Sequence, residues 1–204
     1  MTVNDKRGVL SRLGHLGNVT LELGCGPHKH YPNSIGIDAI DYESVDVVGD
    51  AFEVMQAIPG GVADLISSYH FLEHVPDLDA MLDEMIRVAR PGGRLEVVVP
   101  HFAHPYFYSD PTHVRPFGLY TFSYLARDNI FHRKVPAYRR RENLELRRAD
   151  LVFKSTPPFY GRHAWKRLLG SLFNSGRYMQ ELYEENFSFV FPCYEIRFLL
   201  VKVR

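Results

Sequence analysis

The sequence has few cysteines, no excess of charge of either sign and no long apolar run. Its 204 residues include two cysteines, Cys25 and Cys193, too few for a disulfide framework and suited to a reducing compartment. Lys and Arg number 24, as do Asp and Glu, so overall charge gives no argument for a nucleic-acid or membrane partner. No apolar run approaches the length that spans a bilayer, and residues 1–12 lack the apolar core of a signal peptide. We therefore expect a cytoplasmic protein.

Internal repeats and low-complexity segments are also missing from the sequence. Hydrophobic residues make up 46% of the chain and charged residues 24%, a balance typical of folded globular proteins. A chain of this length is enough for one core, so we expect residues 1–204 to form a single domain. The composition does not indicate an oligomeric state.

The first half alternates between strand-like and helix-like segments, a pattern that predicts a parallel sheet covered by helices. Apolar residues in one helical face predict a helix over residues 78–89, which the Pro-Gly-Gly of residues 91–93 would end. Two late strand-like segments favour an antiparallel pair added to the sheet edge. The predicted strands cover residues 19–23, 36–38, 44–49, 63–68, 94–100, 144–154 and 194–203, and further helices cover residues 121–130, 164–173 and 177–185.

A glycine-containing turn, Glu22-Leu23-Gly24-Cys25-Gly26-Pro27, follows the first of these strands. Glycines there permit unusual backbone angles and let the chain approach a ligand closely. His28 stands where a dinucleotide-binding fingerprint would continue towards its third glycine, and no Walker lysine pattern is present. Asp38 and Asp50 end the next two strands, where ligands bind in open parallel sheets. The pattern therefore indicates a nucleotide-like ligand but argues against a pyrophosphate-binding dinucleotide enzyme.

Several motifs together resemble the class I S-adenosylmethionine (AdoMet)-dependent methyltransferases of the broad small-molecule type. The resemblance covers about half of the chain, residues 18–100, and implies a Rossmann-like, doubly wound α/β fold. That fold has a mostly parallel seven-stranded sheet whose last strand is antiparallel. It also implies that residues 18–100 bind AdoMet and residues 101–204 bind the methyl acceptor. The matching stretches are LELGCG (residues 21–26), GID (36–38), GDA (49–51), SSYHFLEH (67–74) and RVARPGG (87–93).

The same resemblance implies roles for particular residues. Asp38 would hold the ribose hydroxyls, and Asp50 would reach the adenine amino group beside the backbone of Ala51. Ser68 and His70 would border the cofactor and the reaction centre. The resemblance implies no catalytic role for His74, because this position in such motifs is more often a helix-start or packing residue. The residues that would line the methionine portion of AdoMet are Glu22, Gly24 and Gly26.

Titratable side chains are dense in the segment after the fifth strand, which contains His101, His104, Asp110 and His113. Three interpretations are open. The histidines hydrogen-bond and shape the loop. Alternatively His101 or His113, oriented by Asp110, is a general base, with His70 nearby as a further catalytic candidate. The third is a divalent metal ion bound by His101, His104, Asp110 and His113. The segment also resembles a His-Phe…Asp-Pro-Thr-His stretch of bacterial methyltransferases whose acceptor is unassigned.

Two further features of the second half bear on the acceptor. Aromatic residues crowd residues 106–124, where they form either extra core or an aromatic acceptor pocket. Residues 133–148 are locally basic, either as a solvated surface or as a site for an anionic acceptor such as a phosphorylated or nucleotide-linked sugar. The crowded aromatics are Tyr106, Phe107, Tyr108, Phe117, Tyr120, Phe122 and Tyr124, and the basic residues are Arg133, Lys134, Arg139, Arg140, Arg141, Arg147 and Arg148.

The sequence thus predicts an AdoMet-dependent methyltransferase that acts on a hydroxyl or amine of a small molecule or a glycan or nucleotide-sugar precursor. One alternative is a catalytically silent AdoMet-binding module, although a binding module needs no cluster of histidines. A nucleic-acid methyltransferase is a third hypothesis, for which the basic segment is the one supporting feature. We expect no nucleic-acid and no membrane partner.

Overall fold

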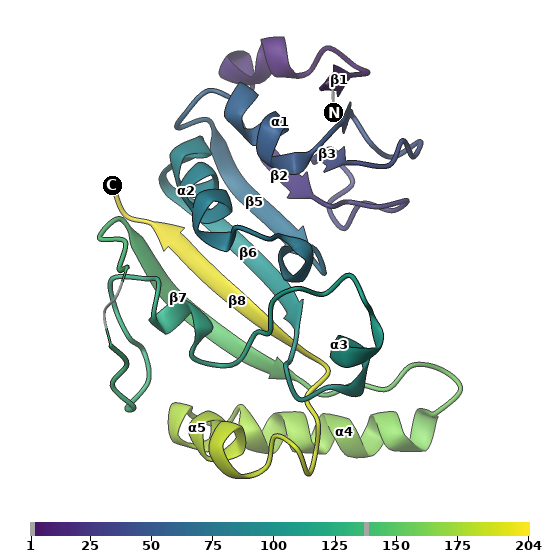
Figure 1. Ribbon diagram of the computed structural model, residues 1–204, viewed down its shortest axis with the longest axis vertical. Coiled ribbons are helices and arrows are strands. Elements are labelled where there is room, and N and C mark those ends of the chain that lie inside the picture. The colour runs from purple at the N-terminus through teal and green to yellow at the C-terminus, as the bar shows by residue number, and fades with distance from the viewer. Residues whose placement is uncertain (1–2, 137–138) are drawn as a thin grey trace.

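The computed structural model describes residues 3–136 and 139–204, which form an α/β structure around one mixed sheet (Figure 1). The strands lie in the order β1-β4-β3-β2-β5-β6-β8-β7. The first five strands along the chain are β1 (Asn4–Asp5), β2 (Thr20–Leu23), β3 (Ile35–Asp38), β4 (Val47–Val48) and β5 (Ala63–Tyr69). The last three are β6 (Ala89–Pro100), β7 (Leu144–Val152) and β8 (Glu195–Lys202).

Helices connect the strands and cover the sheet. Short 3-10 helices cover Leu10–His15, Leu72–His74 and Thr121–Ser123, and the α-helices are α1 (Ala51–Ala57), α2 (Leu78–Val88), α3 (Pro105–Ser109), α4 (Tyr160–Phe173) and α5 (Arg177–Asn186). In Figure 1, α1 and α2 lie over the same face of the sheet, whereas α4 and α5 lie beside the far end of β7 and β8. Helix α2 buries Met81, Leu82 and Met85 along one side, and Asp77 caps its N-terminus by accepting a hydrogen bond from Ala80 N (3.0 Å).

The parallel strands reverse their order next to β2, which pairs with β3 on one side and with β5 on the other. A sheet of this kind leaves a crevice at the carboxyl ends of its strands at such a switch point. Apolar side chains of the central strands, such as Leu23, Ile37 and Ile66, are fully buried, so the residues that follow these strands are held by a rigid core. The residues after β2, β3 and β5 therefore meet at one edge.

The fold class predicted from the sequence is confirmed, with one strand more than the seven predicted. The addition is β1, a two-residue strand antiparallel to β4 at the sheet edge. Strand β8 is antiparallel to both β6 and β7, as predicted for the late pair. Residues 91–93 end α2 as expected, although they already belong to the long strand β6.

The predicted helix over residues 121–130 is wrong, because a single 3-10 turn, Thr121–Ser123, is all that forms there. Backbone groups beyond this turn bond to distant partners, with Arg127 N donating to Leu144 O (2.9 Å) and Arg141 N to Leu125 O (3.0 Å). Tertiary hydrogen bonds have therefore replaced the helical ones. Conversely, the predicted loop after β6 contains the short helix α3, whose first residue is Pro105.

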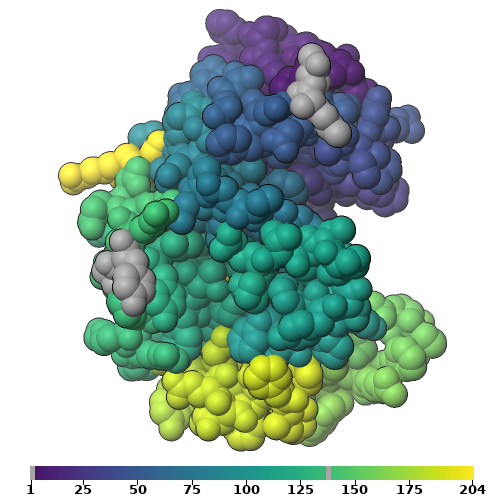
Figure 2. All heavy atoms as spheres, in the orientation of Figure 1, coloured from purple at the N-terminus to yellow at the C-terminus, as the bar shows by residue number. Residues whose placement is uncertain are grey.

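The two halves of the chain pack into one continuous body. In Figure 2 the teal residues that follow β6 lie directly against the blue residues of the first half, and the yellow residues of α5 lie below them. Aromatic residues of the second half divide between core and surface: Phe117 and Phe122 are fully buried, whereas Tyr106 and Tyr108 are exposed. Among the described residues, no helix is long and apolar enough to cross a membrane.

Candidate functional site

A cavity of about 600 Å³ opens at the switch point of the sheet. Gly24 follows β2, Asp38 ends β3, and Asp50 and Ala51 lie where β4 leads into α1, so the three adjacent strand ends all reach it. These four are among the cofactor residues predicted from the sequence. The remaining lining residues are Ala39, Ile40, Phe52, Phe71, His74, Val75, Pro76, Asp77, Ala80 and Met81.

Gly24 allows a tight turn beneath this cavity. Its φ of +64° lies in the left-handed region that side chains disfavour. A Cβ atom at this position would also lie 2.7 Å from the ring of Phe71, closer than real contacts allow. The glycine therefore serves two purposes, since it sets the backbone direction after β2 and makes room for Phe71 in the cavity wall.

Asp38 fixes the glycine turn and still presents both carboxylate oxygens. Oδ2 accepts a hydrogen bond from Gly26 N and Oδ1 accepts one from Ile40 N, each at 2.9 Å. Each carboxylate oxygen can accept a second bond, so Asp38 retains capacity for a ligand's hydroxyl groups. Gly26 thus contributes through the position of Asp38, although it is not a lining residue itself.

Asp50 is the N-cap of α1. Its Oδ1 accepts hydrogen bonds from Phe52 N (2.9 Å) and Glu53 N (3.1 Å), which fixes the carboxylate at the cavity edge. No described residue bonds to Oδ2. The walls around Asp38 and Asp50 are apolar, with Val75 and Met81 among them. A flat apolar base with a polar edge and a sugar bearing two hydroxyls would fit this combination.

Glu22 and Ser68 lie outside the cavity lining. The Glu22 carboxylate is fully buried and accepts hydrogen bonds from His30 N (2.8 Å), Tyr31 N (3.2 Å) and Ser34 Oγ (3.0 Å). It therefore holds the loop between β2 and β3. Ser68 is fully buried in β5, and its hydroxyl has no hydrogen-bond partner among the described residues. A contact of either residue with a cofactor stays a prediction.

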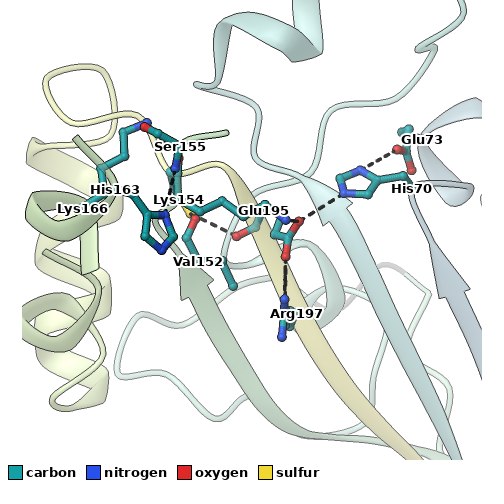
Figure 3. A network of polar contacts seen from close by, with 10 residues as sticks. His70, Glu73, Val152, Lys154, Ser155, His163, Lys166, Glu195 and Arg197 are labelled. Atoms are coloured by element: carbon teal, nitrogen blue, oxygen red, sulfur yellow. Dashed lines mark hydrogen bonds and ion pairs between the residues drawn. The ribbon is translucent and has the colours of Figure 1, made fainter. Parts of the chain in front are cut away.

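His70 follows β5 with a φ of +49°, a strained angle for a non-glycine residue (Figure 3). Its Nε2 lies 3.2 Å from Glu195 Oε2, and its Nδ1 lies 3.3 Å from Glu73 Oε1. Burial disfavours the charged form, but the hydrogen bond to Glu195 and the contact with Glu73 raise the pKa of His70 to about 9. His70 is therefore cationic at neutral pH, which does not suit a general base.

Glu195 is the centre of the charged network that Figure 3 shows. Besides His70, its carboxylate binds Lys154 Nζ (2.6 Å) and Arg197 Nη2 (2.9 Å), although Glu195 itself is almost completely buried. Burial raises the pKa of Glu195, yet the hydrogen bonds from His70, Lys154 and Arg197 lower it to about 2. Neither Lys154 nor Glu195 is predicted from the sequence as a site residue, although both stand at ends of predicted late strands.

His101 is fully buried and has both ring nitrogens engaged. Its Nδ1 accepts a hydrogen bond from Ala103 N (3.1 Å), so its Nε2 carries the proton and donates to Glu184 Oε2 (2.9 Å). The geometry disfavours His101 both as a general base and as a metal ligand, because no lone pair is free. It agrees with the interpretation in which histidines shape the loop.

His104 caps α3, where its Nδ1 accepts a hydrogen bond from Tyr106 N (3.3 Å). Burial lowers the pKa of His104 to about 4, and the nearby charge of Lys166 acts in the same direction. This residue is therefore neutral at physiological pH. As a helix cap, His104 has a structural role, like His101.

His113 differs from the other two histidines of this segment. Its Nδ1 donates to Phe107 O (2.9 Å), which leaves the lone pair on Nε2, and this atom lies 3.7 Å from Asp110 Oδ2 and 4.0 Å from Glu73 Oε1. The backbone carbonyl, not Asp110, therefore orients the ring. Asp110 instead bonds to Thr112 Oγ1 (2.6 Å).

The metal-ligand set predicted from the sequence is not brought together. Among the described residues, the group whose ligand atoms converge is Glu73, His74 and His113, and it shares only His113 with that prediction. The motif LEH contains the other two, but His74 is expected from the sequence to be a packing residue. His113 joins these two residues only because the loop after β6 folds back to this turn. A sequence motif does not reveal that path.

A second, smaller cavity of about 200 Å³ lies at the same sheet edge, beyond the ends of β6 and β7. Three cations and three aromatic rings surround it: Lys154, Arg162, Lys166, Tyr106, Phe159 and Tyr194, together with His104, Ser155 and Thr156. The side chain of Arg162 lies over the ring of Phe159, at 4.6 Å from its centroid. The cavity is therefore basic and aromatic.

The basic segment of residues 133–148 is largely neutralised within the protein. Arg141 bonds to Asp79 (2.9 Å) and Asp83 (2.6 Å) on α2, and Arg148 bonds to Asp150 (2.6 Å). Arg139 and Arg147 also have carboxylate partners. These pairs agree with a solvated surface more than with an anion site.

Comparison with known proteins agrees with the geometry. A family model described as a methyltransferase domain matches residues 6–171. A SAM-dependent methyltransferase from Archaeoglobus fulgidus is 18% identical, with a TM-score of 0.54 over 95% of this chain and 93% of that one. The YcgJ protein from Bacillus subtilis is 15% identical, with a TM-score of 0.51 over 95% of this chain and 97% of that one. At these identities the likeness shows the fold. No curated protein matches the chain.

Proposed function

The chain belongs to the class I AdoMet-dependent methyltransferases, and on that basis we propose that it methylates a hydroxyl or amine of a small acceptor that carries an anionic group. The acceptor class includes phosphorylated or nucleotide-linked sugars. Residues 18–100 would bind the cofactor and residues 101–204 the acceptor, within a single domain. The reaction would take place at the edge where β2, β3, β5 and β6 end.

The observation that carries the cofactor assignment is the convergence of Gly24, Asp38 and Asp50 on one apolar cavity. Asp38 would accept hydrogen bonds from the ribose hydroxyls with its free lone pairs, and Asp50 would accept a hydrogen bond from the adenine amino group. Phe71 and Met81 would enclose the base and exclude water. When bound, AdoMet supplies an electrophilic methyl group on a sulfonium. The chain's own contribution is to hold that group and the acceptor in line.

The basic, aromatic cavity supports the anionic acceptor. Arg162 and Lys166 supply positive charge at the same sheet edge as the cofactor cavity, and Tyr106 and Tyr194 offer flat surfaces for a sugar. Lys154 also lines this cavity, but its charge is already paired with Glu195. Burial lowers the pKa of Lys166, so an anion would restore a favourable environment for its charge. Glu195 contacts both His70 and Lys154, and Lys154 lines this cavity, so Glu195 connects His70 to the cavity wall.

Of the four predicted catalytic residues, His113 has the geometry that best suits the acceptor. Its Nε2 lone pair is free, whereas His101 has no free nitrogen and His70 is protonated at neutral pH. Asp110 orients the local turn through Thr112. His113 is therefore the candidate general base in the metal-free protein, and a metal ion bound at the same Nε2 atom would replace that role.

The acceptor proposal is tested with labelled AdoMet and matched pairs of sugars, each with and without a phosphate. Transfer should be faster to the phosphorylated member, and Lys166→Ala or Arg162→Ala should raise its KM by about 10-fold while changing kcat less. Arg148→Ala, which removes a cation already paired on the surface, serves as the control. Equal transfer to both members, or an unchanged KM in the cavity variants, would show that this cavity does not bind the acceptor.

A further inference from the structure

Glu73 is a buried carboxylate without a hydrogen-bond partner in the described part of the chain. It is completely inaccessible to solvent, and neither Oε1 nor Oε2 accepts a hydrogen bond from a described residue. A buried, ionised carboxylate without hydrogen bonds destabilises the folded state, because nothing replaces the water that it loses on burial. Nδ1 of His70 lies 3.3 Å from Oε1, but without the alignment of a hydrogen bond. The contact with His70 offsets part of the cost of burying Oε1, and Oε2 has no hydrogen-bond partner among the described residues.

Two imidazole rings lie near this carboxylate, and each has one ring nitrogen with an available lone pair. Nδ1 of His113 donates to Phe107 O, so Nε2 carries the lone pair. Thr112 Oγ1 donates to Asp110 (2.6 Å) and therefore accepts from Nδ1 of His74 (2.9 Å), which leaves the lone pair of His74 on Nε2 as well. A backbone carbonyl or hydroxyl bonded to one ring nitrogen is the usual arrangement that orients a metal-binding histidine.

The three groups lie close enough to share one ion. Their ligand atoms are all within 4.8 Å of one another, and Nε2 of His113 is 4.0 Å from Oε1 of Glu73. Two ligands at about 2.1 Å from a common metal can be at most about 4.2 Å apart, so small side-chain rotations suffice. Two histidines and one carboxylate form a ligand set that Zn²⁺ uses in sites with an open coordination position.

We propose that Glu73, His74 and His113 bind one divalent transition-metal ion, Zn²⁺ or an ion of similar preference. Three protein ligands leave at least one position open, as catalytic rather than structural sites do. His74 also lines the cofactor cavity, so a metal ion held by this group would lie near that cavity. If the proposed methyl transfer holds, an acceptor oxygen at this position would lose its proton more readily. The metal site itself does not depend on that reaction.

The ligands come from two segments that are distant in sequence. Glu73 and His74 belong to the 3-10 turn after β5, and His113 belongs to the loop after α3. Backbone hydrogen bonds from Val114 N (2.9 Å) and Arg115 N (3.3 Å) to Glu73 O fix the loop against this turn. The site is therefore held in register by the fold before any ion binds.

The test uses the full-length protein, stripped with a chelator and titrated with Zn²⁺ against a chromophoric competitor. We expect one equivalent per chain, and visible absorption bands of a histidine-ligated site when Co²⁺ replaces Zn²⁺. Glu73→Gln keeps the shape and removes the charge, so it should fold like the wild type and weaken Zn²⁺ binding by about 100-fold or more. His113→Ala should do the same.

His132→Asn is the matched control, because His132 also pairs with a glutamate, Glu181 (2.7 Å), but lies outside the group. Binding below one equivalent, or equal affinity in Glu73→Gln, His113→Ala and His132→Asn, would overturn the metal site. Circular dichroism and thermal unfolding verify that each variant folds, and either ligand variant alone is enough to test the site. AdoMet calorimetry on the same metal-free sample separates the two proposals, since cofactor binding without Zn²⁺ binding refutes the metal site alone.

Discussion

Nε2 of His70 lies 3.2 Å from Oε2 of Glu195, although the two residues are 125 positions apart in the chain. His70 follows β5, and Glu195 begins β8, next to the basic cavity. The same carboxylate binds Lys154 at the end of β7. One buried glutamate therefore connects residues 18–100 to residues 101–204, which we propose to bind the cofactor and the acceptor, and its charge balances cations from both.

Replacing Glu195 by Gln should lower the pKa of His70. Burial lowers the pKa of His70, and the hydrogen bond to Glu195 is the largest of the contributions that raise it to about 9. In the variant this contribution is lost, and burial still lowers the pKa. We expect a fall of about one unit or more, measured from the ring proton shifts in an NMR titration of metal-free protein. Glu43→Gln, at an exposed position, should leave the titration unchanged. An unaltered pKa of His70 in Glu195→Gln would show that the network is not the cause.

Replacing Gly24 by Ala should disrupt the turn beneath the cofactor cavity. The φ of +64° and the contact of 2.7 Å with Phe71 both oppose a Cβ atom. We expect a loss of about 1–3 kcal/mol in the free energy of unfolding, measured with urea, and weaker AdoMet binding. Gly14→Ala meets no atom within 4 Å of the added Cβ and is the control. Similar effects of the two substitutions would contradict the role given to Gly24.

The stability of the protein should fall on mild acidification because of His104. Its native pKa of about 4 lies below the ordinary value of 6.5, so the unfolded chain takes up a proton before the native chain does. Stability from this residue is complete above pH 6.5 and is lost as the pH falls towards 4. Between pH 7 and pH 5 the loss should be on the order of 2 kcal/mol.

His104→Asn tests this pH dependence, because asparagine can cap α3 without titrating. Urea unfolding at pH 7 and pH 5 should show a smaller decrease in stability for the variant than for the wild type. His15→Asn, an exposed substitution, should retain the wild-type decrease. A variant that loses as much stability as the wild type would exclude His104 as the source.

The sequence predicted the sheet and half of the site, because local patterns encode both. Apolar strands ending in glycine or aspartate gave the positions of Gly24, Asp38 and Asp50, and these residues do meet at one cavity. The predicted Glu22 does not line this cavity but holds the loop between β2 and β3, and its contact with the cofactor stays a prediction.

The acceptor side was harder to predict, because its contacts are long-range. Four titratable residues within residues 101–113 suggested one cluster, but His101 pairs with Glu184 on α5 and His104 caps α3. Glu73 gave no signal of its own, since only the three-dimensional path of the loop brings His113 to it. Pairings over such separations are not contained in any short motif.

The most direct measurement of the cofactor assignment is calorimetry of AdoMet binding to the wild type and to Asp38→Ala. We expect saturable binding of one AdoMet per chain and an affinity lower by about 10–100-fold in the variant, because the ribose hydroxyls lose their acceptor. Asp128→Ala, at an exposed aspartate paired with its neighbour Arg127, should bind like the wild type. No saturable binding by the wild type, or equal affinity of Asp38→Ala, would contradict the assignment of this cavity to AdoMet.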